Sequence, residues 1–303
     1  MSFLQTFAEM AVVLFAFAMG YLGNKLGYLG GEVDAKLTKI VLNITLPCML
    51  IATVITGDTL PNLSEIITAL KVAALFYLLT GAAALVLPRL CCKDPGRRGV
   101  WQYSIMFSNV GFLGYPVLAA FYGPEALFYG MTVVLPFNLL TYTLGPPMLG
   151  GKGNFKWKQM LSPSTIAAVF ALVLTLTRFR PAALVGKCLD FVGDVTVPLS
   201  LLVVGSLLAK MPARNVVGIP SLWALTAIRL LALPALFSFI LHTIGIEGLM
   251  LKSAVVQMGM PVAVTGSMLC LEHGGDAEYM AQSVFLSTLA AMITLPIVAA
   301  VMV

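Results

Sequence analysis

Long apolar stretches, separated by short polar segments, make up almost all of this chain of 303 residues. A helix needs roughly 20 apolar residues to cross about 30 Å of hydrocarbon. The pattern predicts an all-α integral membrane protein with ten transmembrane helices and no soluble domain between them. The ten stretches lie near residues 4–24, 35–56, 67–90, 100–122, 125–149, 161–178, 184–209, 219–242, 249–270 and 279–302.

The composition agrees with a membrane protein and argues against most other classes. Hydrophobic residues make up 59% of the chain, charged residues only 10%, and the mean hydropathy is +0.97, whereas soluble domains carry about 25% charged residues. The five cysteines lack the CxxC spacing of metal or redox sites. We find no nucleophile–base pair, metal-ligand cluster or phosphate-binding glycine motif, so we expect neither an enzyme nor a bound cofactor.

Lysine and arginine are divided unequally between the two alternating sets of loops. The positive-inside rule places the richer set in the cytoplasm, so both termini are predicted to lie outside it. The membrane itself is expected to be the plasma membrane of a bacterium. The loops also account for the net charge of +5, which therefore gives no support to a nucleic-acid partner. The poorer set holds Arg178, Arg180, Lys187 and Lys252. The richer set holds Lys25, Lys36, Lys39, Arg89, Lys93, Arg97, Arg98, Lys152, Lys156, Lys158, Lys210 and Arg214.

The chain carries similar patterns twice, about 150 residues apart. The matches are Asn-Ile-Thr-Leu-Pro at 43–47 with Asp-Val-Thr-Val-Pro at 194–198, Gly-Tyr-Pro-Val at 114–117 with Gly-Met-Pro-Val at 259–262, and the spacing of Tyr129 to Pro146 with that of Tyr279 to Pro296. Three matches in one order indicate an internal duplication. Duplicated halves with a broken segment in corresponding places are typical of secondary transporters.

The duplication predicts an inverted repeat. Five spans are an odd number, so a second set of five must enter the membrane from the opposite side. We assign residues 1–150 to the first five-helix repeat and 151–303 to the second, with the basic segment 150–158 as the linker. The linker is short, so the two repeats are expected to form one membrane unit.

The stretches 100–122 and 249–270 each contain glycine followed by proline near the middle. These are Gly114 with Pro116, and Gly259 with Pro261. Proline lacks an amide hydrogen and clashes with the carbonyl four residues back, so each helix is expected to open there, with the proline in the first turn of the second half. An ordinary kink in each helix is the alternative.

Two opened helices that meet in the membrane would form a site for an anion. They would direct amide donors and positive helix ends toward one point, which suits a carboxylate. Asn109 and Gln257 stand beside the two breaks and supply neutral donors and acceptors for such a ligand. Ser108 and Thr265 add hydroxyls and, with Asp194, are candidates for ion coupling, although the oxygens near the crossing are too few and too neutral to identify a coupling ion.

Ionisable residues inside spans are functional candidates, because burying them is costly. Arg229 could bind a substrate carboxylate through two parallel hydrogen bonds. The alternative is a structural ion pair between Arg229 and Asp194. In the repeated motif, Thr45 and Thr196 are expected to bond back to their own helices.

Several segments resemble the auxin efflux carrier family. They are residues 108–123, 194–205 and 257–261. The resemblance implies a fold similar to bile-acid sodium symporters, with scaffold and transport subdomains and with helices 4 and 9 broken and crossing at the substrate site. The plant carriers have an asparagine–proline pair at each crossing and many have a long cytoplasmic loop. This chain lacks both, so auxin itself is not the expected substrate.

The sequence therefore predicts a secondary or facilitative transporter that moves a small organic anion, a mono- or dicarboxylate, by alternating access. The predicted substrate-binding residues are Asn109, Gly114, Pro116, Arg229, Gln257, Gly259 and Pro261. Coupling to H⁺ or Na⁺, the direction of transport and a homodimeric state are left open. The rival interpretation is a membrane sensor or channel-like protein that binds an organic acid without coupled flux.

Overall fold

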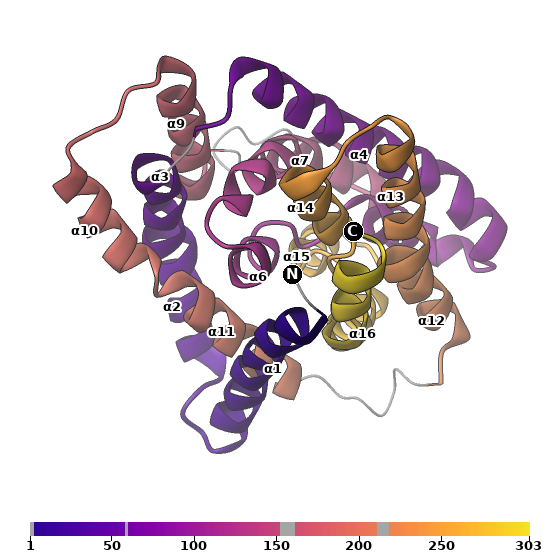
Figure 1. The fold of residues 1–303 in the computed structure, drawn as a ribbon. Coiled ribbons are helices and arrows are strands. Elements are labelled where there is room, and N and C mark those ends of the chain that lie inside the picture. The colour runs from indigo at the N-terminus through magenta and orange to yellow at the C-terminus, as the bar shows by residue number, and fades with distance from the viewer. Residues whose placement is uncertain (1–2, 58–59, 152–160, 211–217) are drawn as a thin grey trace. The chain divides into compact units, whose positions relative to one another are not determined.

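The computed structural model describes residues 3–57, 60–151, 161–210 and 218–303, with side chains from residue 11 onward. These residues form helices and short connections, with no strand among them (Figure 1). The predicted linker at 150–158 falls mostly outside the described residues, as do Arg214 and the lysines at 152, 156 and 158.

Six helical segments of the described chain are long and apolar enough to cross a membrane. Three of them are single helices: α4 (Leu63–Cys91), α7 (Ala126–Met148) and α16 (Ala277–Val301). The segment Gly31–Thr56 comprises α2 (Gly31–Ile40), a π-helical turn η1 (Val41–Thr45) and α3 (Leu46–Thr56), and Ala183–Lys210 comprises α10 (Ala183–Gly193) and α11 (Thr196–Lys210). The segment Pro220–Thr243 comprises α12 (Pro220–Ala227), a π-helical turn η4 (Ile228–Ala232) and α13 (Leu233–Thr243). The protein is therefore a multi-pass membrane protein.

The other four predicted spans are shorter or interrupted. The first and sixth correspond to apolar stretches at Ala11–Lys25, within α1 (Phe3–Lys25), and at Pro163–Thr177, which is α9. The fourth comprises α5 (Arg98–Met106), preceded by a 3₁₀ turn η2 (Pro95–Arg97), and α6 (Gly114–Tyr122). The ninth comprises α14 (Gly248–Met258) and α15 (Thr265–His273).

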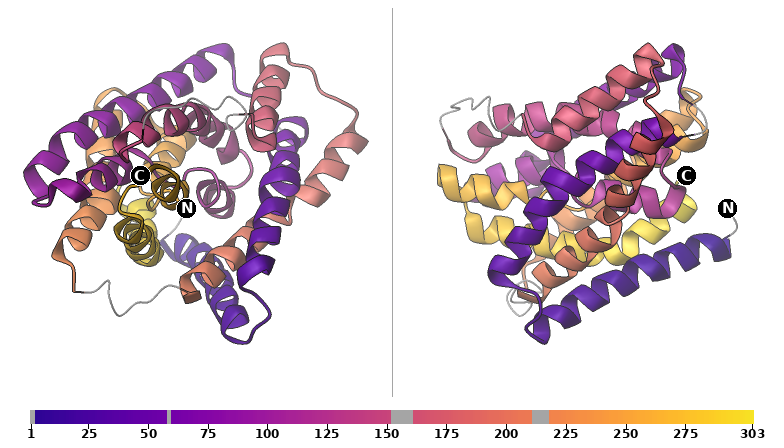
Figure 2. Two further views of the ribbon diagram at one scale, coloured as in Figure 1. Left: turned by 180° about the vertical axis from the view of Figure 1, so that it is seen from behind. Right: turned by 90° about the vertical axis from the view of Figure 1, so that its left-hand side faces the viewer.

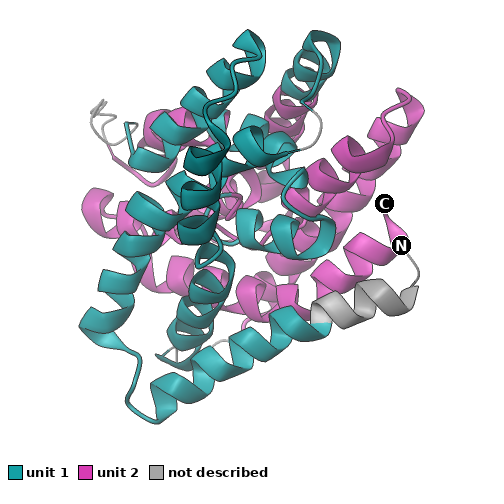
Figure 3. Ribbon diagram, turned by 60° about the vertical axis from the view of Figure 1, so that its left-hand side comes forward, with its two compact units in different colours: residues 1–71, 111–135, 157–210 teal, residues 72–110, 136–156, 211–303 magenta. Residues whose placement is uncertain are grey.

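The chain divides into two compact units, and neither coincides with one of the predicted sequence repeats (Figure 3). Unit 1 comprises residues 1–71, 111–135 and 157–210, and unit 2 comprises 72–110, 136–156 and 211–303. Unit 1 contains α1 to α3, α6 and α9 to α11, whereas unit 2 contains α5 and α12 to α16. Each unit therefore takes helices from both halves of the chain.

Glycines allow the helices of unit 1 to pack closely. A Cβ on Gly193 would lie 2.7 Å from Met49 Cα, and one on Gly205 would lie 2.1 Å from the carbonyl oxygen of Phe17. These contacts bring α10 against α3 and α11 against α1, and the first pair can be followed in Figure 2. Small residues are the usual means of close helix contact in membranes, where no water drives association.

The two π-helical turns have a common cause in the sequence. Pro47 follows η1 and Pro234 follows η4, each two residues after the turn ends. The proline ring would clash with the carbonyl four residues earlier, which lies inside the turn in both cases, and the wider π turn relieves this clash. Our sequence interpretation predicted breaks only in the fourth and ninth spans, so it missed both turns.

Candidate functional site

Both predicted interruptions are present, and their backbones pair within unit 2. The amide nitrogen of Asn109 donates to the carbonyl oxygen of Pro261 at 2.8 Å, and that of Ala263 donates to Phe107 at 3.1 Å. These bonds form an isolated antiparallel bridge between Ser108 and Val262. Backbone groups released from a helix need such partners inside a membrane, because water is absent there. The two broken segments therefore cross, and each provides hydrogen-bond partners for backbone groups of the other.

Pro261 does not occupy the position that the sequence predicted. α15 begins at Thr265, so Pro261 lies in the extended segment and not in the first turn of the second half-helix. Pro116, in contrast, is the third residue of α6, as expected. The extended pairing uses only the carbonyl of Pro261, so it tolerates a residue without an amide hydrogen. The two Gly-x-Pro-Val copies therefore stand at different places relative to their breaks.

Side chains reinforce the crossing. Gln257 donates through Nε2 to the carbonyl oxygen of Val110 at 3.3 Å, and Ser108 donates through Oγ to the carbonyl oxygen of Gln257 at 3.4 Å. The amide of Val262 donates to Ser287 Oγ at 3.1 Å. Asn109 is also buried, with 8% of its surface exposed. The predicted polar residues Ser108, Asn109 and Gln257 are thus brought together.

The remaining predicted site residues have other surroundings. Thr265 Oγ1 and Tyr103 Oη lie 2.8 Å apart, within unit 2. Gly114 and Pro116 belong to α6 in unit 1, where α6 packs against α1 and α11. Gly259 ends α14 as its C-terminal cap. Asp194 is exposed on unit 1 and forms no ion pair among the described residues.

Arg229 is fully buried beside the crossing, within unit 2. Its Nη1 donates to the carbonyl oxygen of Ile105 at 3.2 Å and lies 3.8 Å from Met258 Sδ. Ile105 and Met258 belong to the last turns of α5 and α14, the two helices that end at the breaks. The carbonyl ends of helices carry partial negative charge, which favours a cation there. The described structure contains no hydrogen-bond partner for Nε and Nη2.

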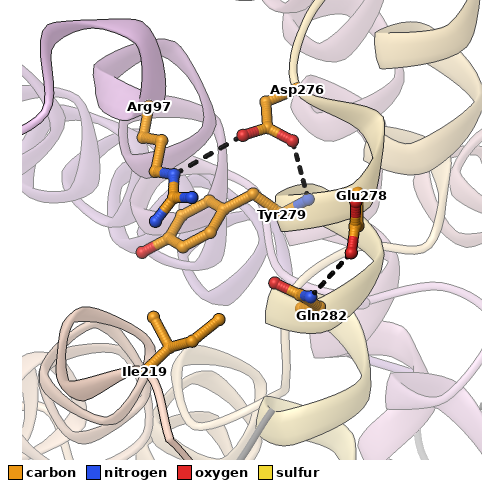
Figure 4. Close-up of a pocket in the computed structure, with 6 residues that line it drawn as sticks. All are labelled: Arg97, Ile219, Asp276, Glu278, Tyr279 and Gln282. Carbon is orange, nitrogen blue, oxygen red and sulfur yellow. Dashed lines mark hydrogen bonds and ion pairs between the residues drawn. The ribbon is translucent and has the colours of Figure 1, made fainter. Parts of the chain in front are cut away.

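A second polar site, which the sequence did not predict, lies on another part of unit 2 (Figure 4). It is a pocket of about 270 Å³ lined by Arg97, Ile219, Asp276, Glu278, Tyr279 and Gln282. Arg97 Nε lies 3.5 Å from Asp276 Oδ2, and its guanidinium stacks 4.6 Å from the centre of the Tyr279 ring. The guanidinium of Arg97 and the carboxylate of Asp276 therefore already form an ion pair. The sequence signal was the spacing of Asp276 to Tyr279, which is that of a helix cap: Asp276 Oδ1 accepts from the Tyr279 amide at 2.9 Å.

The pocket also bears on how the loops alternate. Arg97 precedes the fourth predicted span, Ile219 begins the eighth and Asp276 precedes the tenth. Loops separated by an even number of membrane crossings must lie on one side. The predicted ten-span arrangement therefore places these three loops on one side of the membrane.

The interrupted and crossing helices, within a multi-pass helical membrane protein, define a transporter-like class. The chain belongs to the membrane transport protein family, which it matches over residues 5–154 and 146–299. It is 27% identical over 290 residues to an uncharacterized transporter of Methanothermobacter thermautotrophicus, which covers 94% of both chains. It is also 27% identical over 290 residues to an uncharacterized transporter of Methanocaldococcus jannaschii, covering 91% of this chain and 92% of the relative.

A third relative confirms the resemblance drawn from the sequence. Auxin efflux carrier component 3a of Oryza sativa subsp. japonica is 25% identical over 141 residues, covering 45% of this chain and 23% of the plant protein. The predicted membership in a family that includes the auxin efflux carriers is thus confirmed, and so is the class of membrane transport protein.

Proposed function

We propose that this protein is a secondary or facilitative transporter that moves a small organic anion by alternating access, with its binding site at the crossing of the fourth and ninth spans. Six long spans, two shorter apolar helices and two interrupted helices support a ten-span architecture of two inverted repeats, with the units as scaffold and transport subdomains. Membership in the membrane transport protein family supports a carrier over an enzyme.

The observation that carries this proposal is the state of Arg229. Its guanidinium is 0% exposed, with Nη1 bonded to a helix-end carbonyl. Nε and Nη2, which form one straight edge of the guanidinium, have no partner among the described residues. A buried charge is stable only when it is paired and hydrogen-bonded. Two parallel N–H groups on one edge match the two oxygens of a carboxylate, as they also match two oxygens of a phosphate.

The residues around the Arg229 guanidinium favour the binding of one anion at the crossing. Nη1 holds the guanidinium in a fixed orientation, so little side-chain entropy remains to be lost when a ligand binds. Asn109 and Gln257 lie at the crossing and would contribute neutral hydrogen bonds to the remaining substrate oxygens. Ser108 and Thr265 are engaged with Gln257 and Tyr103, so we assign them to holding the crossing and not to ion coupling.

The test begins with binding. A thermal-shift screen of mono- and dicarboxylates on purified protein should identify a ligand, because a ligand that binds the folded state raises the melting temperature. Arg229→Lys keeps the charge but loses the paired edge. It should weaken binding of that ligand by roughly 10- to 150-fold, the range for losing a hydrogen bond to a charged group. Arg97→Lys, at the pocket of Figure 4, is the matched control and should leave affinity unchanged.

Transport is then measured in proteoliposomes. A carrier shows saturable uptake and counterflow of the labelled anion. Binding without any flux would establish the sensor in its place, and flux that does not saturate would establish the channel-like protein. Wild-type affinity in folded Arg229→Lys protein would overturn the assignment of Arg229 to the site.

A further inference from the structure

The repeated motif at 43–47 and 194–198 lies in unit 1, and the proposed anion site does not use it. In the first copy the helix widens into the π turn η1, which ends at Thr45. In the second copy the helix is interrupted between α10 and α11, just before Thr196. Both copies therefore depart from regular α-helix at the same threonine.

The two copies face each other, because the second and seventh spans run antiparallel. On one side of the motif, Gly193 of α10 packs against the backbone of Met49 in α3. On the other side, Ser206 of α11 donates a hydrogen bond to the carboxylate of Asp34 in α2, at 2.8 Å to Oδ1 and 2.9 Å to Oδ2. The turn η1 itself contacts both α10 and α11.

This register brings the two threonines to one level. Thr196 comes three residues after Gly193, and Thr45 comes four residues before Met49. At about 1.5 Å of rise per residue, these steps correspond to roughly 4.5 Å and 6 Å along the two helices. Thr45 and Thr196, which are equivalent in the repeat, therefore lie opposite each other.

Both hydroxyls are buried without a partner. Thr45 is 4% exposed and Thr196 is 0% exposed, and neither Oγ1 has a hydrogen-bond partner in the described structure. The prediction that they bond back to their own helices is wrong. Thr53, in α3, does bond back to its own helix: its Oγ1 donates to the carbonyl oxygen of Met49 at 2.9 Å. Leaving a buried hydroxyl unpaired is unfavourable, so a bound ligand is a physical explanation for a matched pair of them.

Proline removes one donor from each copy. Pro47 and Pro198 have no amide hydrogen, so neither residue can donate to a carbonyl of the preceding turn. The motif thus provides one unpartnered hydroxyl per copy, and proline removes a backbone donor from each. Oxygen atoms that receive no hydrogen bond are suited to bind a cation. In other transporters, backbone carbonyls of unwound helix segments hold Na⁺.

We propose that the two motif copies form one binding site for a monovalent cation of the size of Na⁺, between the second and seventh spans. Divalent ions prefer several carboxylates, and the described residues contain no group of three or more acidic, histidine or cysteine side chains that could hold a metal. Two neutral hydroxyl oxygens match a single positive charge better than a double one.

The test measures the melting temperature of the purified full-length protein in NaCl, KCl and choline chloride at equal ionic strength, with no organic anion present. The wild type should show a saturable rise in Na⁺ that K⁺ and choline do not reproduce. Thr45→Val and Thr196→Val should each weaken the apparent Na⁺ affinity by about ten-fold or more. Thr45→Ser and Thr196→Ser keep the hydroxyl and should retain the response.

Thr53→Val is the matched control, because its hydroxyl is bonded within its own helix, and it should also retain the response. Equal melting temperatures of the wild type in the three salts would overturn the proposal and indicate a buried water in place of the ion. A full Na⁺ response in both valine variants would overturn it as well. The absence of the organic anion separates this outcome from any result at the site of Arg229.

Discussion

Lys210 Nζ lies 2.5 Å from Asp34 Oδ2, which joins the last residue of α11 to the first turn of α2. Asp34 is 2% exposed and also accepts hydrogen bonds from Ser206 Oγ and, at 2.9 Å, from the amide of Gly30. Both oxygens of this carboxylate therefore accept hydrogen bonds from groups within unit 1. It holds three segments together at one end of the antiparallel pair.

We predict that Asp34→Ala lowers the free energy of unfolding by at least about 2 kcal/mol, because several hydrogen bonds to one buried charge are lost together. Thermal or denaturant unfolding in detergent measures the change. Lys36→Ala, which breaks an exposed pair with Glu32, is the control and should cost about 0.5 kcal/mol or less. Similar losses in the two variants would contradict a special role for Asp34.

Close helix contact in unit 1 predicts that Gly205→Ala is destabilising. Its Cβ would lie 2.1 Å from the carbonyl oxygen of Phe17, so α1 and α11 would have to separate. Overpacking of this kind costs about 1–3 kcal/mol, or more when backbone must move. The matched change Gly218→Ala meets no atom within 4 Å and should leave the melting temperature nearly unchanged. Equal stability of both variants would rule out a tight contact at Gly205.

At the crossing, Asn109→Ala and Gln257→Ala should each weaken binding of the organic anion by roughly 10- to 150-fold, because a hydrogen bond to a charged ligand contributes about 1.5–3 kcal/mol. Binding isotherms on monodisperse protein give the affinities. Ser283→Ala removes a buried hydroxyl that bonds to its own helix and should bind normally. If both polar variants kept wild-type affinity, the breaks would have a structural role and no role in binding.

The unequal loop charges predict that both termini lie outside the cytoplasm. The test uses single cysteines in a background in which the five native cysteines are replaced by alanine. A cysteine at Phe179, whose side chain is 62% exposed, should react with a membrane-impermeant thiol reagent in whole cells. One at Tyr28, 77% exposed, should react only after lysis. The opposite labelling pattern would reverse the topology.

Local chemistry was enough to predict several features of this protein. Apolar stretches indicated a membrane protein, and glycine followed by proline indicated interruptions in the fourth and ninth spans, because a missing amide hydrogen disturbs a helix wherever it folds. The family resemblance was likewise carried by short segments, two of them at those breaks and one in the seventh span. None of these inferences required knowing which helices touch.

The remaining features depend on contacts between residues distant in sequence. Asp34 resembled any loop acid until Ser206 and Lys210, more than 170 residues later, surrounded it. Pro261 was placed in a helix because its pairing with Asn109 leaves no local signal. Burial, hydrogen-bond partners and helix register are set by how the chain packs. For that reason the partner of Arg229, and the buried unpaired hydroxyls of Thr45 and Thr196, emerged only from the folded arrangement.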